Sequence, residues 1–134
     1  MPVRPFATAI PAALCAALAA PMAALADTPV GTWATPPDRK GVTAHIEARP
    51  CGDATCGVIA RTYDAQGRPV ETPNLGVRVF WDMTPAGNGE WTGRAYVPAA
   101  GATVPGTIRV AGDRMEVSGC VGPICRSQTW RRVR

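Results

Sequence analysis

The sequence has few of the residues that hydrolytic catalysis uses. It contains one histidine, His45, and two serines, Ser118 and Ser127. Neither serine lies between two glycines on a sharp turn, the setting that exposes a nucleophilic serine. His45 falls on the polar side of a predicted strand, where a lone histidine is usually a surface residue. The ten acidic residues are scattered, and no pair among them indicates a glycosidase. We therefore expect a protein that is not an enzyme.

The chain also has no helical segment and no strong charge. No stretch keeps a helical hydrophobic period over three turns. Because no helix is predicted, no glycine-rich loop can precede one and cradle a phosphate, and we expect no cofactor. The formal net charge is +4, and the basic residues are spread out except for Arg131, Arg132 and Arg134. This distribution does not indicate a nucleic-acid partner.

The one long apolar run lies near the N-terminus, where residues 12–25 are rich in alanine and leucine. Arg4 precedes this run, and residues 24–26 (Ala-Leu-Ala) have the small-x-small pattern of a cleavage site. Residues 1–26 are therefore predicted to be a secretory signal peptide. The remainder, residues 27–134, has the size of a single domain. We expect an exported protein, either periplasmic or secreted.

Two alternatives for the N-terminus are less well supported. Pro21 interrupts the apolar run, which argues against a membrane span that would persist after export. Cys15 could be lipidated in a lipoprotein, but the bulky Leu14 before it argues against that. Cleavage after residue 26 would also remove Cys15 and reduce five cysteines to four. An even number of cysteines in an exported chain predicts that they pair.

The four remaining cysteines form two C-x4-C brackets, Cys51–Cys56 and Cys120–Cys125. Each bracket encloses turn-forming residues between predicted strands, so its two cysteines can face each other across a hairpin. Exported thiols usually pair, and we expect two local disulfides. A four-cysteine zinc site is the alternative that the spacing allows. We expect no metal.

Short segments with strand-like alternation follow one another through the rest of the chain. The clearest is 42–49, in which Val42, Ala44, Ile46 and Ala48 face one side. Eight strands are predicted, at residues 30–33, 42–49, 57–63, 77–83, 90–97, 103–110, 114–120 and 126–133. Short connections imply antiparallel neighbours. The fold class we expect is all-β, an up-and-down antiparallel barrel of about eight strands, with a two-sheet β-sandwich as the alternative.

Two further expectations concern the strand at 77–83 and the connection before it. Alternation places Val77, Val79, Trp81 and Met83 on one face and Phe80 on the other. The connection over residues 64–76 is the longest, and we expect it to be a lid or a rim loop.

The tryptophans give two interpretations of the barrel interior. Trp33, Trp81, Trp91 and Trp130 lie within or beside strands, and in a barrel filled by side chains they are simply core. If part of the interior is open, the same residues and Arg126 would line a pocket for a small apolar or amphipathic ligand.

Three stretches resemble a known family: residues 30–33 (Val-Gly-Thr-Trp), residues 50–57 around the first bracket and residues 119–130 around the second. Together they resemble the bacterial exported family known as domain of unknown function 2147. The resemblance implies a small secreted or periplasmic β-barrel and assigns no catalytic residue. The Gly-x-Trp opening is also similar to that of lipocalins and other calycins, whose barrels often hold small ligands.

Besides an enzyme, which would need converging polar groups in a cleft, two functions remain open from the sequence. The first is a binding module for a small apolar or amphipathic ligand near Trp33 and Trp130. The second is a protein-interaction module, such as an envelope inhibitor or assembly factor. The second predicts a filled barrel and an exposed apolar or charged patch at the rim.

Overall fold

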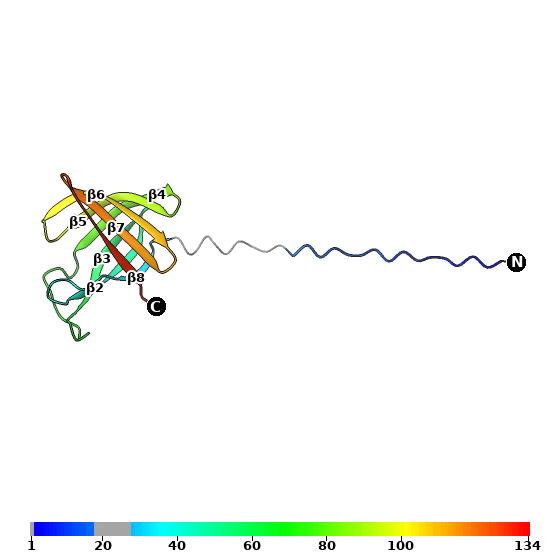
Figure 1. Ribbon diagram of the computed structural model, residues 1–134, viewed down its shortest axis with the longest axis horizontal. Helices are drawn as coiled ribbons and strands as arrows, with labels where there is room; N and C mark the ends of the chain where they lie inside the picture. The colour runs from blue at the N-terminus through cyan, green and yellow to red at the C-terminus, as the bar shows by residue number, and fades with distance from the viewer. Residues whose placement is uncertain (1, 18–27) are drawn as a thin grey trace.

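The computed structural model describes residues 2–17 and 28–134 and contains a closed antiparallel β-barrel (Figure 1). The strands are β1 Gly31–Ala34, β2 Thr43–Cys51, β3 Ala54–Tyr63, β4 Arg78–Gly87, β5 Glu90–Val97, β6 Ala102–Ala111, β7 Arg114–Val121 and β8 Ile124–Arg132. They follow one another around the barrel in chain order. The predicted fold class and strand number are confirmed, and the sandwich alternative is wrong.

The residues before the barrel add little to the fold. Residues 2–17 are exposed and form neither helix nor strand, and Cys15 among them is unpaired. The predicted cleavage site at residues 24–26 lies outside the described residues, so the signal peptide stays a prediction. Within the described part of the chain, no helix has the length and apolarity needed to cross a bilayer.

Successive hairpins place their connections alternately at the two ends of the barrel. We call one end the rim; it carries the connections at residues 35–42, 64–77, 98–101 and 122–123. We call the other end the base; it carries the turns at residues 52–53, 88–89 and 112–113. In Figure 1 the rim faces left and the base faces right.

Both cysteine brackets form hairpin tips, but their turns are tighter than the sequence predicts. The strands continue into each bracket and leave only residues 52–53 and 122–123 as turns. Gly52 and Gly122 have φ of 64° and 58°, a region that glycine enters without steric cost. The disulfides Cys51–Cys56 and Cys120–Cys125 are present as predicted, so the zinc alternative is wrong. The first lies at the base and the second at the rim.

A cluster of buried side chains occupies the barrel interior. The buried cluster contains Trp33, Ile46, Ala48, Ile59, Val79, Phe80, Met83, Ile108, Val110, Met115 and Trp130. Ile46 and Ala48 face inward as the alternation in residues 42–49 predicts, and Ala44 packs partly against them. Burial of these aromatic and branched side chains provides the main stabilisation of the fold.

The prediction for the face of Trp81 is wrong. Phe80 and Met83 are both fully buried, which strict alternation does not allow. Asp82, with φ of 54°, lies where the pairing register between β4 and β5 shifts. A β-bulge of this kind inserts a residue and reverses the alternation. Phe80 therefore joins the core, and Trp81 is left half-buried.

The barrel closes through a short seam between its first and last strands. β1 pairs with β8 at two positions, Trp33 with Arg132 and Ala34 with Arg131. Gly31 begins β1 at a point where a side chain would displace the guanidinium of Arg132. A Cβ atom there would lie 2.6 Å from Nη1 of Arg132. The Gly-x-Trp opening therefore leaves space for this arginine.

Arg132 reinforces the seam by joining three segments of the chain. Its guanidinium donates hydrogen bonds to the carbonyl oxygens of Val30 (3.0 Å) and Thr28 (3.1 Å), just before β1. It donates another to the carbonyl oxygen of Gly112 (3.3 Å), in the turn between β6 and β7. The same group lies 4.3 Å from the ring centroid of Trp33, a cation–π distance.

We expect Arg132→Lys to destabilise the barrel by about 2–3 kcal/mol. Lysine keeps the charge, but it lacks the planar guanidinium that donates to several carbonyl oxygens at once. Urea denaturation measures the change in the free energy of unfolding. Arg131→Lys is the matched control, because Arg131 is exposed in the same strand, and it should change stability by less than about 0.5 kcal/mol. Equal effects of the two substitutions would contradict this account of the seam.

Candidate functional site

Two of the predicted ligand-binding residues lie in the core. Trp33 is 0% exposed and Trp130 is 5% exposed. The indole N–H of Trp33 donates to the carbonyl oxygen of Pro29 (2.8 Å), and that of Trp130 donates to Oε1 of Gln128 (3.0 Å). Trp130 also packs near Phe80, with ring centroids 6.2 Å apart. Both indoles therefore have the hydrogen bonds and contacts of structural core residues.

The other two predicted residues lie elsewhere. Trp81 is half-buried, and the guanidinium of Arg78 lies 4.3 Å from its ring centroid. Arg126 is exposed in β8, toward the rim. In the same strand it is Arg132, at the base, that pairs with Trp33. The structure does not bring the four predicted residues together into one site.

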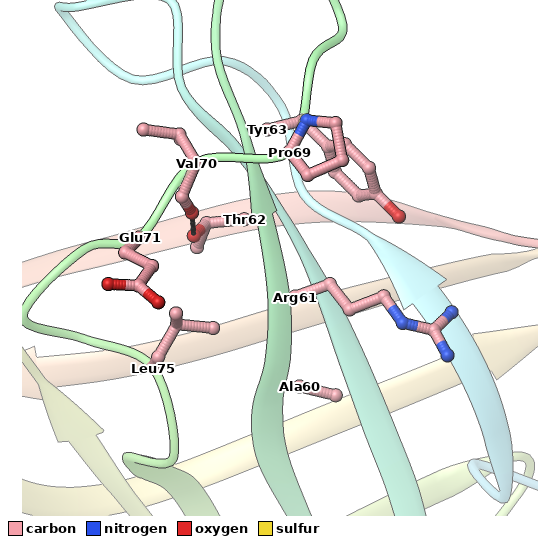
Figure 2. Close-up of a pocket in the computed structure, with 8 residues that line it drawn as sticks. All are labelled: Ala60, Arg61, Thr62, Tyr63, Pro69, Val70, Glu71 and Leu75. Carbon is pink, nitrogen blue, oxygen red and sulfur yellow. Dashed lines mark hydrogen bonds between the residues drawn. The ribbon is translucent and has the colours of Figure 1, made fainter.

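A pocket that the sequence did not indicate lies between β3 and the 64–77 connection (Figure 2). Its volume is about 260 Å³. Its lining residues come from the last part of β3 and from the connection: Ala60, Arg61, Thr62, Tyr63, Pro69, Val70, Glu71 and Leu75. The longest connection is thus a rim element that folds back along a strand.

Hydrogen bonds to β3 hold the connection in place. Val70 and Thr62 exchange two of them: the N–H of Val70 donates to the carbonyl of Thr62 (3.0 Å), and the Thr62 hydroxyl donates to the carbonyl of Val70 (2.5 Å). Further along, the N–H of Gly76 donates to the carbonyl of Ile59 (2.8 Å). Between these two attachments the connection leaves β3, and the pocket occupies that gap.

The turn at the start of the connection is stabilised locally. One carboxylate oxygen of Asp64 accepts from the backbone N–H groups of Gln66 and Arg68, both at 2.9 Å. An aspartate that bonds backbone groups a few residues ahead is typical of an Asx-type turn. The connection is therefore an ordered part of the rim, and these hydrogen bonds determine the shape of the pocket.

The charged groups of the pocket do not converge on one point. Figure 2 shows Arg61 and Glu71 extending to opposite sides of β3, with Val70 and Leu75 on the Glu71 side. His45 lies next to this region, with its ring centroid 4.7 Å from that of Tyr63. Burial, and secondarily the charge of Arg61, lower the pKa of His45. An apolar wall with a cation and an anion at its edges can bind an amphipathic molecule.

A second region with functional character is the tip of the β7–β8 hairpin. Val121 and Ile124 pair across the tip, just beyond the disulfide Cys120–Cys125. Val121 is 41% exposed and Ile124 is 61% exposed. The other large hydrophobic residues exposed on the barrel, Val70 and Leu75, belong to the 64–77 connection of the same end. Exposed apolar side chains on the barrel are thus concentrated at the rim.

Sequence reasoning missed these rim residues, although a weak signal was present. Val121 and Ile124 are the two apolar residues of an otherwise turn-like bracket, where a solvated loop would normally be polar. The pocket gave no such signal, because it depends on how the 64–77 connection folds against β3. No group of three or more histidine, cysteine, aspartate or glutamate side chains suited to a metal ion occurs among residues 2–17 and 28–134.

The chain matches a known protein family. The sequence profile of a family described as "Uncharacterized protein conserved in bacteria (DUF2147)" matches residues 31–132, which cover all eight strands. No curated protein and no protein of solved structure matches the chain significantly.

We expect Arg61→Gln to raise the pKa of His45 toward its ordinary value of about 6.5, because the substitution removes a neighbouring positive charge. His45 is the one histidine of the sequence, so its imidazole proton resonance can be followed by NMR without ambiguity. Arg94→Gln, an exposed arginine on β5, is the control and should leave the titration unchanged.

The lowered pKa also fixes the direction of a pH effect on stability. The folded protein disfavours the charged imidazole, so the unfolded chain binds this proton more readily. The contribution of His45 to stability is therefore complete above about pH 6.5 and is lost as the pH falls toward the lowered pKa. A titration of His45 that is identical in the wild type and in Arg61→Gln would contradict the assignment.

Proposed function

Because the chain belongs to the uncharacterised bacterial family DUF2147, we propose its function from its own surface: it is an exported protein-interaction module that binds a partner protein through its rim. The observation that carries this proposal is the contrast between a packed core and exposed apolar residues at one end of the barrel. The two disulfides are compatible with export. The proposed role is one of binding, not of catalysis.

The rim has the physical properties of a contact surface. Val121 and Ile124 lie on a hairpin tip that a disulfide fixes, so little conformational entropy is lost when a partner binds it. Apolar side chains held in water at such a tip gain free energy when a partner covers them. They would then serve as anchors within a larger interface that includes the 64–77 connection.

The test is photo-crosslinking in the bacterial host with p-benzoylphenylalanine at one of two positions. Ile124 at the rim hairpin and Asp53 at the base hairpin are both exposed and both lie within a loop closed by a disulfide, so they are matched. We expect one defined protein adduct from position 124 and none from position 53. Val121→Ser should reduce that adduct about tenfold, the size of effect expected for an interface anchor, without lowering the melting temperature of the barrel.

Two results would contradict the proposal. One is an absence of any adduct at position 124. The other is an adduct that is equally strong at position 53, since that would show contact unrelated to the rim.

A second candidate function, binding of a small amphipathic ligand, is favoured by the pocket beside β3. The positions first expected for such a ligand, around Trp33 and Trp130, are occupied by packed core. The pocket has apolar walls from Pro69, Val70 and Leu75. Its volume of about 260 Å³ lies just below the ~300–1,000 Å³ usual for ligand sites. This is why we place small-ligand binding second.

The ligand hypothesis has a direct test with a lipophilic fluorescent dye. We expect a saturable fluorescence increase that Leu75→Lys abolishes, because a charged side chain would enter the apolar side of the pocket. Thr129→Lys, at an exposed site on β8, should leave it unchanged. An absent response, or one that both variants retain, would remove this candidate.

A further inference from the structure

β8 has an edge that no strand covers over most of its length. The strand spans Ile124–Arg132, but β1 pairs with it only at Arg131 and Arg132. From Ile124 to Trp130, that side of β8 has no strand partner among residues 28–134. The barrel is closed at the base and has an open edge toward the rim.

The sequence after β1 explains why the edge stays free. Continuing β1 alongside β8 would require residues 35–41 to follow the same register, but Pro36 and Pro37 have no backbone N–H to donate. The chain turns toward β2 instead. There the N–H of Thr35 donates to the carbonyl of Ala44 (2.9 Å) and that of Asp38 donates to the carbonyl of Val42 (2.9 Å).

The free edge has the form of a strand ready to accept another strand. Residues Ile124 to Thr129 are all exposed, so solvent reaches this stretch on both faces. The register between β7 and β8 runs without a bulge from Arg114↔Arg131 to Val121↔Ile124. The stretch contains no proline, and the disulfide Cys120–Cys125 fixes its end. An uncovered, regular edge about 20 Å long is a template for β-strand addition.

The charge of the strand indicates what kind of segment would pair with it. β8 carries Arg126, Arg131 and Arg132 and no acidic residue. Arg131 faces Arg114 of β7, and within the described chain neither these two nor Arg126 forms an ion pair. Opposite charges on a neighbouring strand stabilise pairing, and like charges oppose it. A second copy of β8 would bring arginine against arginine.

We propose that the free edge of β8 binds an extended acidic segment of a partner protein by β-strand addition. This inference rests on the proposed protein-interaction function and names its mode: backbone hydrogen bonds along Ile124 to Thr129, an acidic side chain beside Arg126, and an apolar residue against Ile124. The hairpin tip anchors the partner, and the edge aligns it.

The probe is a synthetic octapeptide of alternating glutamate and valine, observed by amide hydrogen exchange on ¹⁵N-labelled protein. At saturating peptide we expect exchange of edge-facing amides between Ile124 and Thr129 to slow by about tenfold or more, as new backbone hydrogen bonds form. A lysine–valine peptide should give no protection. Raising the salt to about 0.5 M should weaken binding of the acidic peptide, because screening shortens the reach of the arginine charges.

Two charge-reversed variants separate strand addition at this edge from general attraction to a basic protein. Arg126→Glu should weaken peptide binding by about tenfold, whereas Arg94→Glu, which changes the net charge equally on exposed β5, should change it by less than about twofold. Equal weakening by both variants would overturn the proposal. Binding without protection of the β8 amides would also overturn it.

Failure of this inference can be told apart from failure of the proposed function. If position 124 crosslinks to a partner but the peptide never slows amide exchange in β8, the rim binds protein by another mode. Only the proposal of strand addition is then wrong. If position 124 captures nothing, the proposed function is lost as well. Slow amide exchange of β8 without peptide, together with a dimer in sedimentation analysis, would show that a second copy of the chain covers the edge. That result would overturn the proposal of an acidic partner.

Discussion

Closure of the barrel depends on the contact between Arg132 and Trp33. The two strands that meet at the seam share only two residue pairs. The next smallest number is three, between β3 and β4. The arginine compensates by bonding the segment before β1 and the turn between β6 and β7, while its planar group covers the indole. Buried Trp33 would otherwise lie beneath an open joint between the first and last strands.

The same arrangement creates the functional asymmetry of the barrel. At the junction of β1 and β8, strand pairing, the cation–π contact and the hydrogen bonds of Arg132 all lie at the base. Toward the rim, Pro36 and Pro37 direct the chain away from β8, so the upper part of the last strand has only β7 beside it. The exposed apolar residues of the barrel lie at this less constrained end. A rigid core thus supports one end that is open to association, as is common for binding surfaces carried on a stable scaffold.

Much of the fold was predictable from the sequence because its determinants are local. Alternation in residues 42–49 placed Ile46 and Ala48 in the core, and turn residues separated eight strands of nearly correct extent. The paired cysteines lie at hairpin tips, where sequence neighbours are also spatial neighbours. Short connections left antiparallel pairing as the natural arrangement.

What the sequence did not predict depends on contacts distant in the chain or on an unusual backbone. The bulge at Asp82 requires a positive φ, which is uncommon outside glycine, and it exchanged the roles of Phe80 and Trp81. The pocket arises from hydrogen bonds between β3 and a connection with no regular pattern. The tryptophan and arginine positions suggested a ligand site. Tryptophan is also common in a packed core and arginine on a protein surface, so residue type alone could not assign a function.

The seam also has a consequence for the order in which the barrel assembles. Its hydrogen bonds join residues about a hundred positions apart, as in the bond from Arg132 to Val30, with a separation of 102. The hairpins β2–β3 through β7–β8 close short loops, whereas the seam closes the longest one and bears the largest entropic cost of closure. Joining of β1 to β8 is therefore expected after the folding transition state. Changes at Arg132 should then alter how fast the native barrel unfolds far more than how fast it forms.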